Sequence, residues 1–388
     1  MAGPTFDPKY EWATKNNILS GITLGQWLRL LWWRGRHVDW LRYWQRVAFI
    51  TLLATINSVI SVMEWMLWES TIQATAINPR PVFVLGHPRT GTTLLHTLLS
   101  LDKDRFAYCS TFQCGFPSGF LCLRNVSWLF AGVVDKTRPM DNMDLNFETP
   151  QEDELATNLL SSGVSPYMPL VMMRQEPDFR PFFTFKDGGF VAGRPAVERW
   201  TEAFLYFLKK VSVFSQGRRL VIKSPVHTAR VALILQLFPD AQFVYIHRDP
   251  VTVLQSALNM ADKTYWYSYL NRPSPDQILD FVTNQFEALF DAYEADKKLI
   301  PDGNLVEVRF ADLEADLAGE MGRIYRELGW NGYDESARPA VAAYAAAKQS
   351  YRKNKLAELD PELSRLITER WAHICVAQGY PLPPLPFD

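Results

Sequence analysis

GHPRTGTT (86–93) decides the fold, because it lies between a predicted strand and a predicted helix. The apolar run PVFVL (81–85) before it is typical of a strand buried on both faces, and TTLLHTLLSL (92–101) after it has a helical pattern. Strand, glycine loop and helix in this order are the context of a phosphate-binding loop. Gly86 and Gly91 let successive N–H groups converge on an anion, and the helix N-terminus adds the positive end of its dipole.

The loop lacks the lysine that ATP- and GTP-using loops carry, since Thr92 stands at that position. Lysine and Mg²⁺ together serve the charge of β- and γ-phosphates. A ligand with a single phosphate bearing a sulfonate carries less charge there and needs no metal. Arg89 supplies a cation from within the loop, and Thr92 or Thr93 can donate hydroxyl hydrogen bonds. An ordinary glycine turn remains the alternative for this stretch taken alone.

The strand-then-helix order returns three times, at RLVIK (219–223), QFVYIH (242–247) and LVEVRF (305–310). This alternation predicts an α/β, P-loop-like, three-layer fold with a central, mostly parallel sheet and helices on both faces. Residues 102–218 are loop-rich and aromatic, and we interpret them as substrate-facing insertions. In such sheets the ligand lies at the carboxyl ends of the strands, where GHPRTGTT, KSP and HRDP all fall.

The HRDP cluster adds a second anion site. Arg248 ends a predicted strand, Asp249 can cap the next helix, Pro250 suits its first turn, and Ser256 lies about two turns further on. Arg248 and Ser256 can therefore contact one further phosphate.

Together these clusters resemble the sulfotransferases that use 3′-phosphoadenosine 5′-phosphosulfate (PAPS). GHPRTGTTLL (86–95) looks like their 5′-phosphosulfate loop in its arginine form, and HRDPVTVLQS (247–256) looks like their 3′-phosphate motif. LVIKSPVH (220–227) is similar to the lysine-containing segment of tyrosylprotein and related carbohydrate-type sulfotransferases. Cytosolic sulfotransferases carry lysine where this loop has Arg89, so the resemblance is closer to the arginine-loop group and to bacterial-type general sulfotransferases.

The resemblance implies PAPS as donor substrate, no metal, and EC 2.8.2 chemistry. The SYRKNK stretch (350–355) either closes over the 3′-phosphate or forms a solvated helix face. The predicted PAPS contacts are His87, Pro88, Arg89, Thr90, Gly91, Thr92, Thr93, Arg248, Ser256, Arg352 and Lys353.

Sulfuryl transfer needs a base for the acceptor hydroxyl and a cation for the charge that grows on the leaving phosphate. Lys223 and Arg89 are the candidate cations. TPQEDELA (149–156) offers Glu152 or Glu154 as the base, because burial in an aromatic surrounding would raise the pKa of such a carboxylate. Acids in a first helical turn also serve as dipole partners, and His227 is the second candidate base.

The acceptor is not specified by the sequence. The abundant aromatic residues favour a hydroxyl on a hydrophobic small molecule or lipid. Tyrosylprotein sulfotransferases place a glutamate just after the first helix, but FAYCSTFQCGFPS (106–118) contains none, which disfavours tyrosine peptides. With 40 Lys and Arg against 42 Asp and Glu, no global basic field suggests nucleic acid. The alternatives are a P-loop phosphotransferase and a non-catalytic, nucleotide-binding, membrane-associated protein.

The chain divides by composition into residues 1–78 and a catalytic domain at 79–388. The first part is helical and rich in tryptophan and arginine, a mixture that suits a membrane interface. Its apolar run forms a cap on the domain, a monotopic helix or a transmembrane anchor, and the oligomeric state stays open. No secretory signal is recognisable and the four cysteines form no C-x-x-C pair, so we expect a cytoplasmic protein, with peripheral membrane contact as an open alternative.

Overall fold

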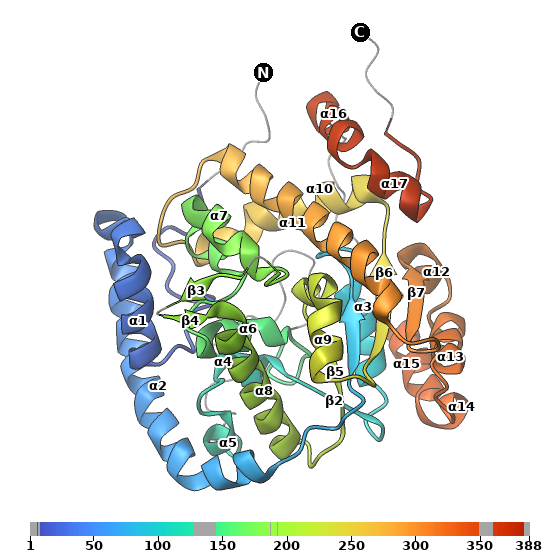
Figure 1. Ribbon diagram of the computed structural model, residues 1–388, viewed down its shortest axis with the longest axis horizontal. Helices are drawn as coiled ribbons and strands as arrows, with labels where there is room; N and C mark the ends of the chain where they lie inside the picture. Colours follow the sequence, from blue (N-terminus) through green and yellow to red (C-terminus); the bar gives the residue numbers. More distant parts are fainter. Residues whose placement is uncertain are drawn as a thin grey trace.

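The computed structural model describes residues 6, 8–126, 145–186, 188–191, 193–348 and 360–383. Five strands form one sheet in the order β2-β5-β1-β6-β7, and every pairing in it is parallel (Figure 1). The predicted α/β fold with a central parallel sheet is therefore confirmed. The strands are β1 (Val82–Leu85), β2 (Phe106–Tyr108), β5 (Arg219–Lys223), β6 (Gln242–His247) and β7 (Leu305–Arg309).

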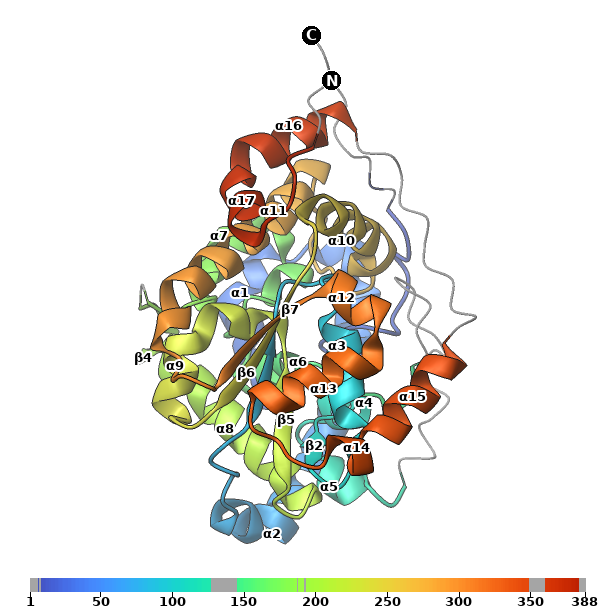
Figure 2. The same ribbon diagram turned by 90° about the vertical axis from the view of Figure 1, so that its right-hand side faces the viewer.

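The three layers follow from the alternation of side chains along β1. Val82 and Val84 join a core with one set of helices, whereas Phe83 and Leu85 join a second core with another set. The first set is α3 (Thr92–Ser100), α12 (Phe310–Ala315), α13 (Leu317–Glu327) and α15 (Arg338–Ala347); the second is α8 (Ala196–Phe214), α9 (Val231–Leu237), α10 (Pro250–Thr264) and α11 (Pro275–Asp296). Figure 2 shows the first set on one side of the strands and α8, α9 and α11 of the second set on the other.

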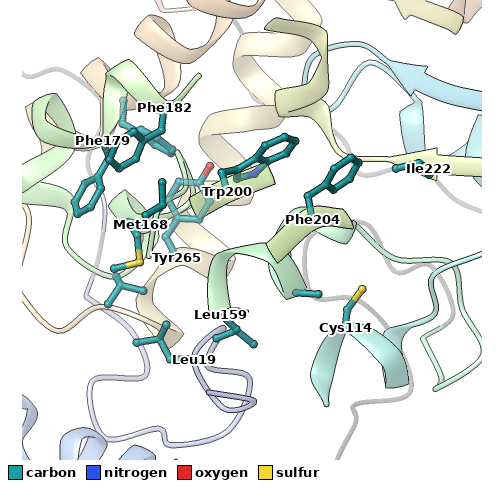
Figure 3. Packing of buried hydrophobic residues seen from close by; sticks show 14 of the residues in the cluster. Leu19, Cys114, Leu159, Met168, Phe179, Phe182, Trp200, Phe204, Ile222 and Tyr265 are labelled. Carbon is teal, nitrogen blue, oxygen red and sulfur yellow. The ribbon is translucent and has the colours of Figure 1, made fainter. Parts of the chain in front are cut away.

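Residues 102–218, which were predicted to be loop-rich, contain more regular structure than the sequence indicated. They contain the edge strand β2 and the 19-residue helix α8. Figure 3 shows Trp200 and Phe204 of α8 in the same buried cluster as Met168 and Phe182. Shorter helices in this segment are α4 (Thr111–Gly115), α5 (Phe120–Leu123), α6 (Asp153–Leu160) and α7 (Glu176–Phe179), and β3 (Phe190–Val191) pairs with β4 (Arg194–Pro195). Further along the chain are α14 (Tyr333–Ser336), α16 (Pro361–Arg370) and α17 (Ala372–Gln378).

The N-terminal region forms α1 (Leu24–Arg34) and the long helix α2 (Trp40–Ala74), which packs on α1, α5 and α8. Asn57 donates to the carbonyl oxygens of Ser20 and Ile22 at 2.8 and 3.0 Å. Glu64 of α2 forms a buried ion pair with Lys210 of α8. Among the described residues, α2 is the one helix long and apolar enough to cross a membrane, and 22% of its most apolar stretch is buried.

Candidate functional site

The loop after β1 has a backbone that requires glycine at two positions. Gly86 has φ 139° and Gly91 has φ 102°, both in the region that L-residues rarely adopt. A Cβ on Gly91 would lie 2.3 Å from Cδ2 of Phe310, and a Cβ on Gly86 would lie 2.4 Å from the carbonyl oxygen of Ile246. The tight turn expected from the two glycines is therefore present, with α3 beginning directly after it.

Side chains within the loop divide into a buried set and a partly exposed set. His87 is buried, contacts the carbonyl oxygen of Pro88 through Nδ1 at 2.6 Å, and packs its ring against Phe286. Burial lowers the pKa of His87 to about 3, so the ring is neutral. The Thr90 hydroxyl donates to the carbonyl oxygen of His87 at 2.8 Å. Both side chains therefore shape the loop, and the buried Thr92 side chain lies with them, whereas Pro88, Arg89, Gly91 and Thr93 are partly exposed.

The register of the sheet brings the predicted cationic residues to the two sides of this loop. Lys223 of β5 is paired with Val84, and β6, which precedes Arg248, flanks β1 on its other side. Asp249 accepts hydrogen bonds from the backbone N–H groups of Val251 and Thr252, so it caps α10 as expected. Three clusters that are far apart in the chain thus meet at one edge of the sheet.

The two predicted phosphate motifs also touch each other. Arg89 Nε donates to Ser256 Oγ at 3.0 Å, and the Arg248 guanidinium lies 4.4 Å from the ring centre of Phe310. Burial lowers the pKa of Arg248, and the charge of Arg89 acts in the same direction. Two cations that act on each other electrostatically favour a bound anion near both, although Glu314 opposes the effect on Arg248. Arg352 and Lys353, the other predicted contacts, lie outside the described residues.

The segment at the edge of the sheet that contains residues 149–152 places Glu152 beside Lys223. Residues 149–152 lie antiparallel to residues 109–111, which directly follow β2. Ser110 and Pro150 form an isolated β-bridge there. The ammonium of Lys223 lies 2.7 Å from Glu152 Oε1, and the hydroxyl of Tyr167 donates to Oε2 at 2.5 Å. The side chain of Lys223 is 2% exposed and that of Glu152 is 22% exposed. Glu152 is thus a carboxylate with an exposed edge and polar partners, not the apolar surrounding that the sequence suggested.

Glu154 and His227, the other two candidate bases, have no exposed face. Glu154 is fully buried and paired with Arg230 at 2.8 Å, and it also accepts hydrogen bonds from Ser165 and Trp200. His227 Nε2 lies 2.7 Å from Asp153 Oδ2, and both side chains are fully buried. Neither group is positioned to meet an acceptor, because neither side chain has an exposed atom.

These buried groups instead connect the two segments that carry Lys223 and Glu152. Ser224 Oγ donates to Asp153 Oδ1 at 2.8 Å and accepts from the backbone N–H of Glu154 at 3.0 Å. Burial alone would raise the pKa of Asp153, but His227 and Ser224 outweigh it and hold that pKa below its usual value. The geometry of the Lys223–Glu152 pair therefore rests on this network.

The sulfotransferase family model matches residues 81–335, and this range includes the glycine loop, the Lys223 segment and the Arg248 motif. The chain belongs to the sulfotransferase family. It is 30% identical to the omega-hydroxy-beta-dihydromenaquinone-9 sulfotransferase Stf3 of Mycobacterium bovis and of Mycobacterium tuberculosis, over 95% of this chain and 92% of theirs. The chain is thus a sulfotransferase enzyme, and the resemblance seen in the sequence is confirmed. The phosphotransferase and non-catalytic alternatives are not retained.

Solved sulfotransferase structures share the fold. STF1 of Mycobacterium tuberculosis H37Rv has a TM-score of 0.64 at 19% identity, over 90% of this chain and 91% of that one. STF9 of Mycobacterium avium has a TM-score of 0.63 at 15% identity, over 93% and 98%. Both alignments are long enough to include the N-terminal helices as well as the sheet.

Sequence reasoning missed Tyr167, which touches the candidate base of this sulfotransferase. Burial raises the pKa of Tyr167 well above its usual value, and Glu152 acts in the same direction, so the hydroxyl stays protonated and donates. Tyr167 lies 15 residues from Glu152 in a segment without periodicity. No local pattern in the sequence marks this contact.

We expect Tyr167→Phe to lower kcat about tenfold, the effect of one charge-assisted hydrogen bond. A hydrogen bond to the charged form favours that form, so its loss should move the acidic limb of the kcat profile to higher pH. The measurement is a pH series of kcat. Tyr206→Phe is the matched control, because Tyr206 also donates to a glutamate, Glu69, but outside this site. An acidic limb of the kcat profile at the same pH as in the parent enzyme would show that Tyr167 contributes packing and no hydrogen bond to the base.

Proposed function

We propose that this sulfotransferase transfers the sulfuryl group of PAPS to a hydroxyl of a hydrophobic, lipid-type acceptor, with Glu152 as the general base. The observation that carries the proposal is the Lys223–Glu152 pair, 2.7 Å apart at the carboxyl end of β5 and beside the glycine loop. Its members supply the two charges that sulfuryl transfer uses: a carboxylate to take the acceptor proton and a cation for the leaving phosphate.

The donor assignment is supported by the residues around the loop. The close backbone approach at Gly86 and Gly91 suits an anion held by N–H groups at the start of α3. Arg89 supplies the cation for the 5′-phosphosulfate. Arg248 and Ser256, the latter within hydrogen-bond distance of Arg89, suit the 3′-phosphate that distinguishes PAPS from other adenine nucleotides.

The reaction that we propose is a single in-line displacement at sulfur. The acceptor oxygen forms a bond to sulfur while its proton passes to Glu152 Oε, and the bond between sulfur and the bridging phosphate oxygen breaks. The electron pair of that bond stays with the phosphate, which leaves as part of 3′,5′-phosphoadenosine (PAP). Lys223 stabilises the charge that develops on the bridging oxygen. During the reaction its ammonium therefore loses part of its contact with Glu152 and contacts the leaving phosphate instead.

The acceptor class rests on the related protein. Stf3 is a sulfotransferase of a hydroxylated menaquinone, and the match to it extends over nearly the whole chain. Tyr265 and Trp266 follow α10 in the apolar interior of the same domain. We infer that the acceptor of this chain likewise has a long apolar portion and a terminal hydroxyl. We place the enzyme in the cytoplasm, acting on acceptors that partition into lipid.

The proposal is tested by transfer of radiolabelled sulfate from PAPS to a polyprenyl alcohol, a simple sugar and a tyrosine peptide, with PAP and AMP affinities from calorimetry. We expect the label on the polyprenyl alcohol, and PAP affinity at least about tenfold above AMP affinity, as one lost charge-assisted contact predicts. Label on the sugar or peptide alone would overturn the lipid-type acceptor. Equal affinities for PAP and AMP would overturn the donor.

A further inference from the structure

A row of exposed apolar side chains lies along the two N-terminal helices. We call it the apolar face, and it includes Trp32, which is 93% exposed, and Leu41, which is 98% exposed. Helices α1 and α2 lie side by side on the flank of the molecule remote from β7 (Figure 1). The other exposed members are Leu28, Trp40, Trp44, Leu52, Ile56, Val59, Val62, Met63, Trp65, Met66 and Leu67.

The opposite side of α2 is held against the domain by polar contacts. Arg46 is fully buried and donates through Nε to the carbonyl oxygen of Ala13 at 2.9 Å, while Glu64 accepts from the backbone N–H of Leu121 at 2.7 Å. Within α2 the two acidic residues are Glu64, which is buried, and Glu69, which bonds Tyr206. The apolar face therefore carries no carboxylate from α2, and the helix lies along the domain.

A cationic groove of about 910 Å³ borders the apolar face, between α1, α2 and α8. Trp65 and Val62 belong to both. Three cations in its lining form no ion pair with a described residue: Arg29 donates to Ser162, Lys209 donates to Gln73, and the Nε of Arg199 is buried without a hydrogen bond, although the charge of Glu202 acts on Arg199. Two others in the lining are already neutralised, Lys210 by Glu64 and Arg194 by Glu202, and the remaining carboxylate of the lining, Glu69, accepts from the Tyr206 hydroxyl, so the cations are in excess.

We propose that the apolar face lies in the interface of a lipid bilayer, with the cationic groove holding anionic headgroups. Tryptophan side chains at both ends of an aliphatic stretch, Trp40 and Trp44 before it and Trp65 after it, are the composition of an interfacial helix. Cations without carboxylate partners complement phosphate headgroups, whereas a purely apolar protein contact would leave them buried and unpaired. A fluid bilayer also accommodates a long, irregular ridge of side chains that a rigid partner would have to match.

This inference is independent of the proposed donor and acceptor, because the apolar face and groove share no residue with the Lys223–Glu152 pair or the glycine loop. The surface would nevertheless place the enzyme where acceptors with long apolar chains dissolve. A failure of vesicle binding would leave PAP affinity and sulfate transfer unchanged, so the two proposals fail separately.

The test is flotation of the full chain with vesicles of phosphatidylcholine alone or of phosphatidylcholine and phosphatidylglycerol in equal parts. We expect flotation that is stronger with phosphatidylglycerol. Val59→Asp/Met66→Asp should lower the bound fraction at least about tenfold, because it removes two apolar side chains and adds charge at the interface. The matched control is Leu299→Asp/Val376→Asp, which alters two exposed apolar residues outside α1 and α2 and should float like the parent protein.

A second pair of variants separates charge from apolar contact. Arg199→Gln/Lys209→Gln should abolish the preference for phosphatidylglycerol, whereas Lys103→Gln/Lys298→Gln removes the same charge from exposed positions outside the groove and should keep it. PAP affinity in every variant verifies folding. Parent protein that floats with neither vesicle would overturn the proposal, as would flotation unchanged by Val59→Asp/Met66→Asp. A dimer that this variant converts to monomer, without vesicle binding, would assign the face to a second copy of the chain.

Discussion

Glu152→Gln is expected to lower kcat by about 10²- to 10⁴-fold, the range for loss of a general base. Glutamine keeps the shape of the side chain and leaves an oxygen for the Tyr167 hydroxyl, but its amide cannot take the acceptor proton. The variant also places a neutral group beside Lys223, which is 2% exposed, so we expect a lower thermal midpoint. Kinetics at saturating PAPS and a PAP titration together check the prediction.

The matched control for this variant is Glu148→Gln. Glu148 is an exposed carboxylate in the segment that leads to Glu152, so its loss removes the same charge and should leave kcat unchanged. A Glu152→Gln enzyme that binds PAP and turns over at the normal rate would exclude Glu152 as the base. In that case the buried Glu154 and His227 would have to become exposed during turnover.

Lys223→Ala should lower kcat and kcat/KM together by about 10²-fold or more, because it removes a donor that acts on charge developing in the transition state. Nucleotide affinity should change little. Folding should be less affected than by Glu152→Gln, since the carboxylate left behind is 22% exposed and can be hydrated. Steady-state kinetics with direct titration of PAP measures both quantities.

Arg248→Ala provides the contrast to Lys223→Ala. Arg248 forms no ion pair within the described part of the chain and lies over Phe310, so we expect its loss to weaken PAP binding and to leave kcat at saturation near normal. A lysine used only to attract the nucleotide would behave like Arg248. A Lys223→Ala enzyme that regained full kcat at high PAPS would therefore remove Lys223 from the chemical step.

The sheet was predictable because its central strands are buried on both faces. Residues 81–85, 219–223 and 242–247 are nearly continuous apolar runs, and such runs together with a following helical pattern specify parallel strands. The edge strand β2 is only three residues long and was missed for that reason. Helix α8 was missed although its buried residues Trp200, Phe204, Phe207 and Val211 have helical spacing. Its pattern was obscured by the aromatic loops before it.

The sequence predicted which residues lie at the site but not the role of each one. Parallel strands end at one edge, so Gly86, Lys223 and Arg248 had to lie near one another once the sheet was recognised. The sequence could not decide among Glu152, Glu154 and His227, since all three are polar residues close to strand or helix ends. Their burial differs: Glu154 meets Arg230 from 76 residues away and His227 meets Asp153 from 74 residues away, whereas Glu152 keeps an exposed edge.

The sequence by itself determined the glycine loop, the parallel sheet and the cationic residues at the strand ends. These depend on local pattern and on the geometry that every parallel sheet shares. Only the tertiary structure decided which carboxylate keeps an exposed edge, and that Tyr167 bonds it. It also decided that Glu64 turns inward to Lys210, leaving the outer side of α2 apolar. Burial and pairing of a charge depend on groups distant in the chain, and one residue's type and neighbours do not specify them.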